Sequence, residues 1–239
     1  MNIVLLQAED WLGDRMAVLR DRRAVHLRRV LKVAVGDSIR VGQLGGLCGR
    51  AVIEAFDASG VRLRVELSEP PPARHRFDIA LALPRPKMLR RILRQCAEFG
   101  VADLHLIHSA RVEKSYWQSP LLQPERLQEA LLMGLERSRD TIAPRVHLHR
   151  RFRPFVEDQL PGICAGRPCW IADWGAPLAL VDAPPQPALV MIGPEGGFVP
   201  FEVQLAEAVI ARRVSLGGRI LSVDTAFTSV LALGLGPGR

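Results

Sequence analysis

Leu189-Val190-Met191-Ile192-Gly193-Pro194-Glu195-Gly196-Gly197-Phe198 is a short apolar run that breaks into glycines. A second segment further along the chain has the same arrangement: Leu216-Gly217-Gly218-Arg219-Ile220-Leu221-Ser222-Val223-Asp224-Thr225-Ala226. Each apolar run is typical of a buried strand in an α/β sheet. Each glycine-rich loop leads into a helical pattern, at 201–211 and 225–235. Ligands of open α/β sheets bind beyond the carboxyl ends of the strands, so two such loops can form the walls of one pocket.

The glycines of the first loop explain why a ligand can come close to the backbone. Gly193, Gly196 and Gly197 have no Cβ and can adopt positive φ, so their amides and carbonyls can close directly on a bound molecule. A single glycine-rich loop is weak evidence, since most are only tight turns. The pair of loops is more specific.

Ile-Gly-Pro-Glu-Gly-Gly-Phe at 192–198, followed by Leu-Gly-x-Arg-Ile-Leu-x-x-Asp-Thr-Ala at 216–226, resembles the signature segments of the SPOUT methyltransferases. Within that superfamily the chain resembles the ribosomal RNA small subunit methyltransferase E family, the 16S rRNA uracil-N3 methyltransferases. The resemblance implies an α/β fold with a knotted parallel sheet, a C-terminal trefoil knot and a small N-terminal PUA-like β-barrel. It also implies S-adenosylmethionine as cofactor and an obligate homodimer.

Composition indicates a folded protein whose basic charge is explained either by a polyanionic partner or by a basic proteome or solubility. The chain has 239 residues, of which 48% are hydrophobic, enough to bury a real core. It has no apolar segment long enough to span a bilayer, and its N-terminus does not resemble a signal peptide. Its four cysteines are scattered, which favours reduced thiols in a cytoplasmic protein. The net charge of +7 favours binding to phosphates.

The first part of the chain is predicted to be a small β-barrel. Short strand patterns at 38–41, 49–55 and 61–67 are separated by glycine-rich turns. Three prolines between Ser68 and Arg74 then favour an extended spacer. The predicted domains are therefore 1–69, a PUA-like RNA-binding barrel, and 74–239, the methyltransferase domain.

A basic segment at 21–33 is the main candidate for contact with RNA. His26-Leu27-Arg28-Arg29-Val30-Leu31 followed by Gly36-Asp37 matches the N-terminal motif of the family. A solvated basic helix is the alternative, and the position of the run on a separate β-domain favours RNA. The predicted RNA-binding residues are His26, Arg28, Arg29, Lys32, Lys87, Arg91 and Arg111.

The second part of the chain reads as alternating strands and helices. A strand at 77–83, an amphipathic helix at 87–99 capped by Gly100, and a strand at 101–107 give the β-α-β order of a parallel sheet. A second helix is predicted at 124–136. His147 and His149 alternate on a basic strand, but without a third ligand of definite spacing no metal site is expected.

Several positions depart from the family pattern. Around 136–144 an arginine, Arg139, stands one position early, and Asp140 occupies the place of the family arginine. Ser222 replaces another usual arginine, and Asp224 replaces the common glutamate. The chain is therefore identified as a divergent member.

The chemistry that the resemblance implies needs positioning more than a nucleophile. S-adenosylmethionine carries an activated methyl group, so the protein has to align the acceptor and exclude water. Uracil N3 must lose a proton; Glu195 and Asp224 are the candidate bases, and Arg219 or Arg139 can stabilise the anion. The predicted cofactor-binding residues are Ile192, Gly193, Pro194, Glu195, Gly196, Gly197, Leu216, Gly217, Arg219, Ile220, Leu221, Thr225 and Ala226.

Two functions of different class remain open. The first is an enzyme that methylates a ribosomal RNA uridine at N3. The second is a non-catalytic or retargeted paralogue that binds ribosomal RNA, favoured by the changes at Asp140 and Ser222. A nicotinamide-dependent dehydrogenase is excluded, because no Gly-x-Gly-x-x-Gly follows an early strand.

Overall fold

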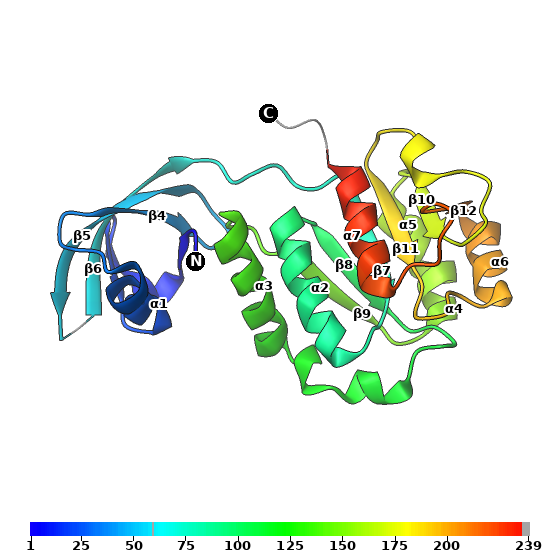
Figure 1. Ribbon diagram of the computed structural model, residues 1–239, viewed down its shortest axis with the longest axis horizontal. Coiled ribbons are helices and arrows are strands. Elements are labelled where there is room, and N and C mark those ends of the chain that lie inside the picture. Colours follow the sequence, from blue (N-terminus) through cyan, green and yellow to red (C-terminus); the bar gives the residue numbers. More distant parts are fainter. Residues whose placement is uncertain (59, 236–239) are drawn as a thin grey trace. The chain divides into compact units, whose positions relative to one another are not determined.

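The computed structural model describes residues 1–58 and 60–235. The chain forms two compact units, Met1–Ala73 with Leu132–Ala143, and Arg74–Leu131 with Pro144–Arg239. Figure 1 labels most helices and strands of the two units. The first unit therefore includes a segment from far downstream, which the predicted division into 1–69 and 74–239 does not contain.

The first unit is built on a six-stranded sheet in the order β1-β4-β5-β6-β3-β2. The β1–β4 pair is parallel and the other pairs are antiparallel. Inward-facing apolar residues of these strands pack with Ala24 and Leu27 into one core. The strands are β1 (Val4–Leu6), β2 (Trp11–Gly13), β3 (Met16–Leu19), β4 (Ser38–Gln43), β5 (Cys48–Asp57) and β6 (Gly60–Glu69).

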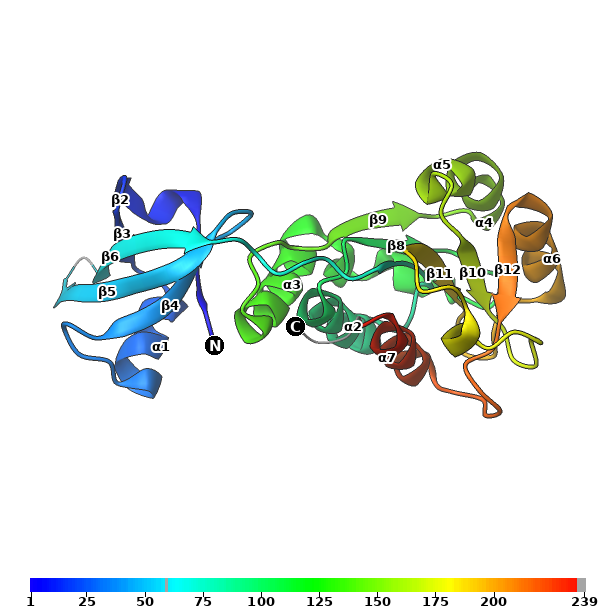
Figure 2. The same cartoon turned by 90° about the horizontal axis from the view of Figure 1, so that it is seen from above.

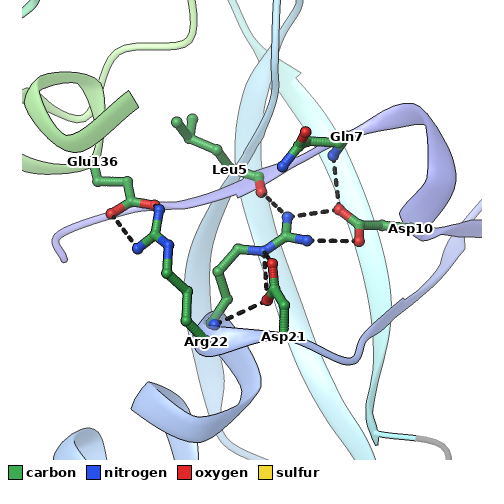
Figure 3. Close-up of polar contacts among 7 residues, drawn as sticks. Leu5, Gln7, Asp10, Asp21, Arg22 and Glu136 are labelled. Atoms are coloured by element: carbon green, nitrogen blue, oxygen red, sulfur yellow. Dashed lines mark hydrogen bonds and ion pairs between the residues drawn. The ribbon is translucent and has the colours of Figure 1, made fainter. Parts of the chain in front are cut away.

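The basic segment is helical, as α1 (Arg22–His26) continued by a π-helical turn, η2 (Leu27–Leu31). One of its arginines is part of the fold rather than the surface. Arg23 is 4% exposed, and its guanidinium donates to both carboxylate oxygens of Asp10 at 2.6 and 2.8 Å. It also donates to Asp21 at 3.0 Å and to the carbonyl of Leu5 (Figure 3). Each nitrogen of this buried cation is thus hydrogen-bonded.

The downstream segment 132–143 is held on the first unit by several bonds. The amide of Asn2 donates to the carbonyl of Glu136 at 2.7 Å, and Arg22 binds the carboxylate of Glu136 at 2.6 Å (Figure 3). Asp140 is buried, and its Oδ1 accepts from the amides of Thr141 at 2.7 Å and Ile142 at 3.1 Å. Asp140, predicted to stand at the place of a family arginine, therefore caps a turn in this structure.

Replacing Arg23 by methionine should leave Asp10 as a buried, unpaired carboxylate. We expect the first unit to lose about 3–5 kcal/mol of unfolding free energy, measured by urea denaturation. Arg62→Met is the matched control, because Arg62 and its partner Asp57 are partly open to solvent and a surface pair contributes at most about 1 kcal/mol. Equal losses in the two variants would contradict a structural role for the buried cluster.

The second unit contains a six-stranded sheet in the order β12-β10-β11-β7-β8-β9, with every pair parallel. This confirms the predicted parallel α/β sheet. Helices α2 (Pro86–Phe99) and α7 (Val223–Gly234) lie on one face, and α4 (Phe152–Pro154), α5 (Leu160–Cys164) and α6 (Pro200–Val209) on the other (Figure 2). The strands are β7 (Phe77–Ala82), β8 (Asp103–Ile107), β9 (Arg145–His149), β10 (Cys169–Ala172), β11 (Ala188–Ile192) and β12 (Ala211–Val214).

Most predicted elements are present, with one shift. Helix α2 buries the predicted apolar face and ends at Gly100 with φ of 72°. Helix α3 (Pro124–Ser138) extends two residues beyond its predicted end. A strand was expected at the apolar start of the segment that begins at Leu216. The structure instead has strand β12 before this segment, and β12 begins at Ala211, the residue at which a helix was predicted to end. This strand lies at the sheet edge, so it carries the exposed Arg212 and gives no continuous apolar signal.

Two expectations about the chain as a whole can be compared with the structure. The four cysteines are all free and buried. None of the described helices combines the length and the apolar character that a bilayer span requires.

His75 fixes the end of α7 against the sheet. Its Nδ1 accepts from the amide of Phe77 at 3.0 Å, and its Nε2 lies 2.9 Å from the carbonyl of Leu231. Neutral imidazole with the proton on Nε2 satisfies both contacts, whereas a proton on Nδ1 would face the Phe77 N–H. Burial lowers the pKa of His75 below its ordinary value.

Because the folded pKa of His75 is lowered, its contribution to stability is complete above its unfolded pKa and is lost as pH falls. We expect the unfolding free energy of the second unit to decrease between about pH 7 and about pH 5. His75→Gln should flatten that dependence and cost about 1–3 kcal/mol at neutral pH, measured by urea denaturation. His26→Gln in the first unit serves as control. An unchanged pH dependence in His75→Gln would contradict this role.

Candidate functional site

A cavity of about 320 Å³ opens where three adjacent parallel strands of the second unit end. Its walls come from the residues after β10, the loop after β11, the loop after β12 and the first turn of α7. This is the position at which open α/β sheets bind ligands. The lining residues are Ala172, Asp173, Trp174, Ile192, Gly193, Pro194, Gly196, Gly197, Phe198, Leu216, Gly217, Arg219, Ile220, Leu221, Val223 and Ala226.

The loop after β11 is folded tightly on its own backbone. A Cβ on Gly193 would lie 2.9 Å from the amide nitrogen of Phe198, closer than real Cβ contacts allow. Gly197 has φ of 74°, and its amide donates to the carbonyl of Pro194 at 2.8 Å. At Gly197 a Cβ would meet no atom within 4 Å, so this part of the wall has space beside the backbone.

Two side chains from elsewhere in the unit hold this loop in place. Arg111, which follows β8, donates to the carbonyl oxygens of Gly196 and Gly197, the latter at 3.3 Å. Glu202, 3% exposed, accepts from the amide of Ala110 at 2.7 Å and from that of Val199 at 3.0 Å. Arg111, predicted to bind RNA, therefore contacts the glycine loop in this structure. Sequence reasoning missed Glu202, although Pro200-Phe201-Glu202 has the pattern of a helix start with a capping carboxylate.

The loop after β12 forms the outer wall and is apolar where it meets solvent. Ile220 is 82% exposed and Trp174, on the opposite strand end, is 65% exposed, although both line the cavity. Arg219 is the one guanidinium among the lining residues of this cavity. Asp173 is the one carboxylate there, and it pairs with Arg213 at 2.6 Å.

The start of α7 carries a small polar network. The hydroxyl of Ser222 donates to Asp224 at 2.7 Å and lies 2.8 Å from the hydroxyl of Thr225. Arg91 of α2 binds the other oxygen of Asp224 at 3.0 Å. The Ser222 hydrogen bond, with a smaller contribution from Arg91, lowers the pKa of Asp224. Asp224 is thus an anion at neutral pH and a weaker base than an ordinary carboxylate.

Eleven of the thirteen residues predicted to bind a cofactor line the cavity, and the exceptions are Glu195 and Thr225. Glu195 lies beside the cavity wall with its carboxylate 3.9 Å from Arg85. Of the other predicted catalytic residues, Arg219 lines the cavity, Asp224 lies in the α7 network, and Arg139 belongs to the first unit. Sequence reasoning missed Ala172, Asp173, Trp174, Phe198 and Val223.

The predicted RNA-binding residues divide between the units. His26, Arg28, Arg29 and Lys32 lie on or directly after α1 and η2. Arg28 donates to the carbonyls of Asp57 and Gly60 at 3.0 and 2.9 Å, so part of its donor capacity is used within the fold. Lys87 and Arg91 lie on α2, where Lys87 is exposed and Arg91 binds Asp224.

Comparison with known proteins identifies the family. The family model for the RNA methyltransferase domain matches residues 71–234. Ribosomal RNA small subunit methyltransferase E of Synechocystis is 30% identical over 95% of this chain and 75% of its own length. The chain belongs to the ribosomal RNA small subunit methyltransferase E family.

Other relatives cover the chain to a similar extent. The methyltransferase E protein of Treponema pallidum is 29% identical over 98% of this chain and 90% of its own length. A probable rRNA methyltransferase from Porphyromonas gingivalis is 26% identical, with a TM-score of 0.74 over 96% of this chain and 95% of that one. The Neisseria gonorrhoeae methyltransferase E, solved with S-adenosyl methionine, has the same fold, with a TM-score of 0.75 at 20% identity over 97% and 95%.

Removing the Arg111 side chain should loosen the glycine loop without unfolding the unit. A hydrogen bond from a charged donor contributes about 1.5–3 kcal/mol, so amides of 195–198 should exchange roughly ten to a hundred times faster in Arg111→Met. Hydrogen–deuterium exchange by mass spectrometry measures this, with Arg90→Met on the exposed face of α2 as control. Unchanged exchange in the loop, or an equal effect of Arg90→Met, would contradict the positioning role of Arg111.

Proposed function

We propose that the protein transfers the methyl group of S-adenosylmethionine to N3 of a uridine in 16S ribosomal RNA. The observation that carries the proposal is the cavity with glycine-rich walls at the ends of β10, β11 and β12, in a chain of the methyltransferase E family. S-adenosylmethionine supplies a methyl group already activated on a sulfonium. The residues of the chain then have to bind, orient and exclude water.

The cavity residues fit this cofactor. Its volume of about 320 Å³ lies in the range of small-molecule sites. Ile192, Leu221 and Ala226 offer apolar surface suited to an adenine ring, and the open space at Gly197 lets the backbone approach the ligand. The carboxylate of Asp173 provides an acceptor for the hydroxyl or ammonium groups of the cofactor.

The acid–base roles follow from the charges around the cavity. We assign removal of the N3 proton to Glu195, whose exposed carboxylate adjoins the cavity wall and lies 3.9 Å from the guanidinium of Arg85. Arg219 stabilises the uracil anion from the cavity rim. Asp224, held by Ser222 and Arg91, fixes the start of α7 instead. Arg139 stays a second candidate for binding the anion.

The first unit provides the proposed RNA-binding surface. Its curled sheet is consistent with a PUA-like barrel, and a cavity of about 450 Å³ there is lined by Arg20, Arg28 and Arg29. These arginines and Lys32 would contact phosphates, with His26 beside them. Lys87 and Arg91 of α2 are proposed as separate RNA contacts of the second unit. Such contacts position the RNA and add a salt-dependent affinity that carries no sequence information.

We also propose the trefoil knot, a homodimer and a cytoplasmic location. In support of the knot, the carbonyl of Ser215 accepts a hydrogen bond from the amide of Leu180 at 2.9 Å. The amide of Ser215 donates to the carbonyl of Leu178 at 2.8 Å. The 173–187 loop thus lies directly on the chain where it leaves β12 toward α7. In support of a dimer, Trp174, Ile220 and Leu235 are exposed apolar side chains of this unit, as at surfaces that another chain covers.

Mass spectrometry of ribosomal RNA from a strain lacking the gene tests the function. One 16S uridine should lose its N3 methyl group and regain it when the gene is restored. Purified protein with S-adenosylmethionine and undermethylated small subunits should restore the same nucleotide. Normal methylation in the deletion strain would overturn the proposal, and RNA binding without transfer would favour the non-catalytic paralogue.

Filling the cavity should abolish cofactor binding while the fold persists. The Ala226→Leu substitution adds three carbons, which would project from the buried first turn of α7 into the space for the cofactor. Isothermal titration with S-adenosylmethionine should show at least about a tenfold weaker affinity for Ala226→Leu, a loss of about 1.4 kcal/mol or more. Ala232→Leu, on the exposed side of the same helix, should bind as the wild type does. Equal affinity in the two variants would contradict this cavity as the cofactor site.

A further inference from the structure

A cluster of imidazoles and a carboxylate lies on the edge of the second sheet, away from the cavity. Strands β8 and β9 pair in register, with Asp103 opposite Arg145, His105 opposite His147 and Ile107 opposite His149. Because side chains two residues apart share a face, Asp103, His105, His147 and His149 project from the same side of these strands. The rings of His105 and His147 stack with centroids 4.5 Å apart.

The donor atoms of this cluster converge. Oδ1 of Asp103 lies 2.7 Å from Nε2 of His147. One ligand atom from each of Asp103, His105 and His147 lies within 4.8 Å of the others. A tetrahedral ion with bonds of about 2.0–2.1 Å separates its ligand atoms by about 3.3 Å, so small side-chain rotations would bring the three donors around one ion.

The fourth histidine supports the arrangement from outside. Nε2 of His149 lies 3.0 Å from Nδ1 of His105, and the His149 ring packs on Phe155 at 4.6 Å between centroids. Histidine ligands usually have their second nitrogen hydrogen-bonded to a neighbour that fixes the ring orientation. His149 is placed to do this for His105.

Access and charge are also suitable for a cation. His105 is 5% exposed, whereas the side chain of His147 is 40% exposed, so an ion can enter from the open edge. Asp103 currently pairs with Arg145 at 2.5 Å, but the Arg145 side chain is 74% exposed and can swing into solvent. The neighbouring Asp78 is occupied by Arg167 at 2.6 Å.

We propose that Asp103, His105 and His147 bind a first-row divalent metal ion, with Zn²⁺ as the preferred ion, and that His149 orients His105. Two imidazoles and one carboxylate are ligands typical of Zn²⁺, Co²⁺ and Ni²⁺, whereas Mg²⁺ and Ca²⁺ prefer oxygen donors alone. The ion would join the edge strand β9 to β8. The sequence showed only His147 and His149, which lie on one strand. The ligands Asp103 and His105 come from another strand, which β-pairing brings alongside.

The experiment titrates untagged, chelator-treated full-length protein with Zn²⁺ by calorimetry and with Co²⁺ by visible absorption. We expect one ion per chain, an intense Co²⁺ spectrum of low coordination number, and no binding of Mg²⁺. His147→Gln should weaken Zn²⁺ binding at least about a hundredfold, and His149→Ala about ten- to a hundredfold. His26→Gln, a histidine of the first unit, should bind as the wild type does.

Two results would overturn the proposal. One is the absence of saturable Zn²⁺ and Co²⁺ binding by the wild-type protein. The other is equal affinity of His147→Gln and wild type, which would place the ion elsewhere. If His147→Gln fails to fold, the Zn²⁺ affinity of Asp103→Asn and the Co²⁺ spectrum of the wild-type protein take its place. A Co²⁺ spectrum of hexa-aqua type would exclude nitrogen ligands. Methyl transfer is not needed for any of these measurements, so the test is independent of the proposed function.

Discussion

The close approach of Gly193 to the amide of Phe198 is the constraint on which the site depends. At 2.9 Å the position of a missing Cβ leaves no room for any other residue, so the loop after β11 folds back on itself and leaves its backbone facing the cavity. Arg111 then binds the carbonyls in the middle of this loop, and Glu202 accepts from the amide of Val199 at its end. A wall made of backbone can bind a ligand closely, and its rigidity comes from these outer side chains.

The two units hold charged side chains in place in different ways. In the first unit the buried Arg23 is saturated with hydrogen bonds. Arg22 pairs with Glu136 and Arg28 donates to two carbonyls, so several cations of the basic segment also serve the fold. In the second unit Asp224 is held by Ser222 and Arg91 at the start of α7. Asp140, Ser222 and Asp224, the positions at which the sequence predicted departures from the family pattern, all make local hydrogen bonds. Their changes are compatible with a preserved site.

Sequence predicted the strands with continuous apolar runs, the helix α2 with its glycine cap, and most of the cavity lining, because periodicity and glycine spacing are local properties. It failed where the cause is non-local. Strand β12 has a polar edge sequence, and Asp173 and Trp174 line the cavity only because β10 lies between β11 and β12. The bond from Ala110 to Glu202 and the pairing of His105 with His147 likewise join segments far apart in sequence.

A crystal structure with S-adenosylmethionine bound tests the central claim most directly. The account predicts the cofactor in the cavity at the ends of β10, β11 and β12, with the adenine against Ile192 and Leu221 and the backbone of the glycine loop in hydrogen-bond contact. A cofactor bound at another place, or a cavity filled by the protein's own side chains in the presence of saturating cofactor, would contradict it.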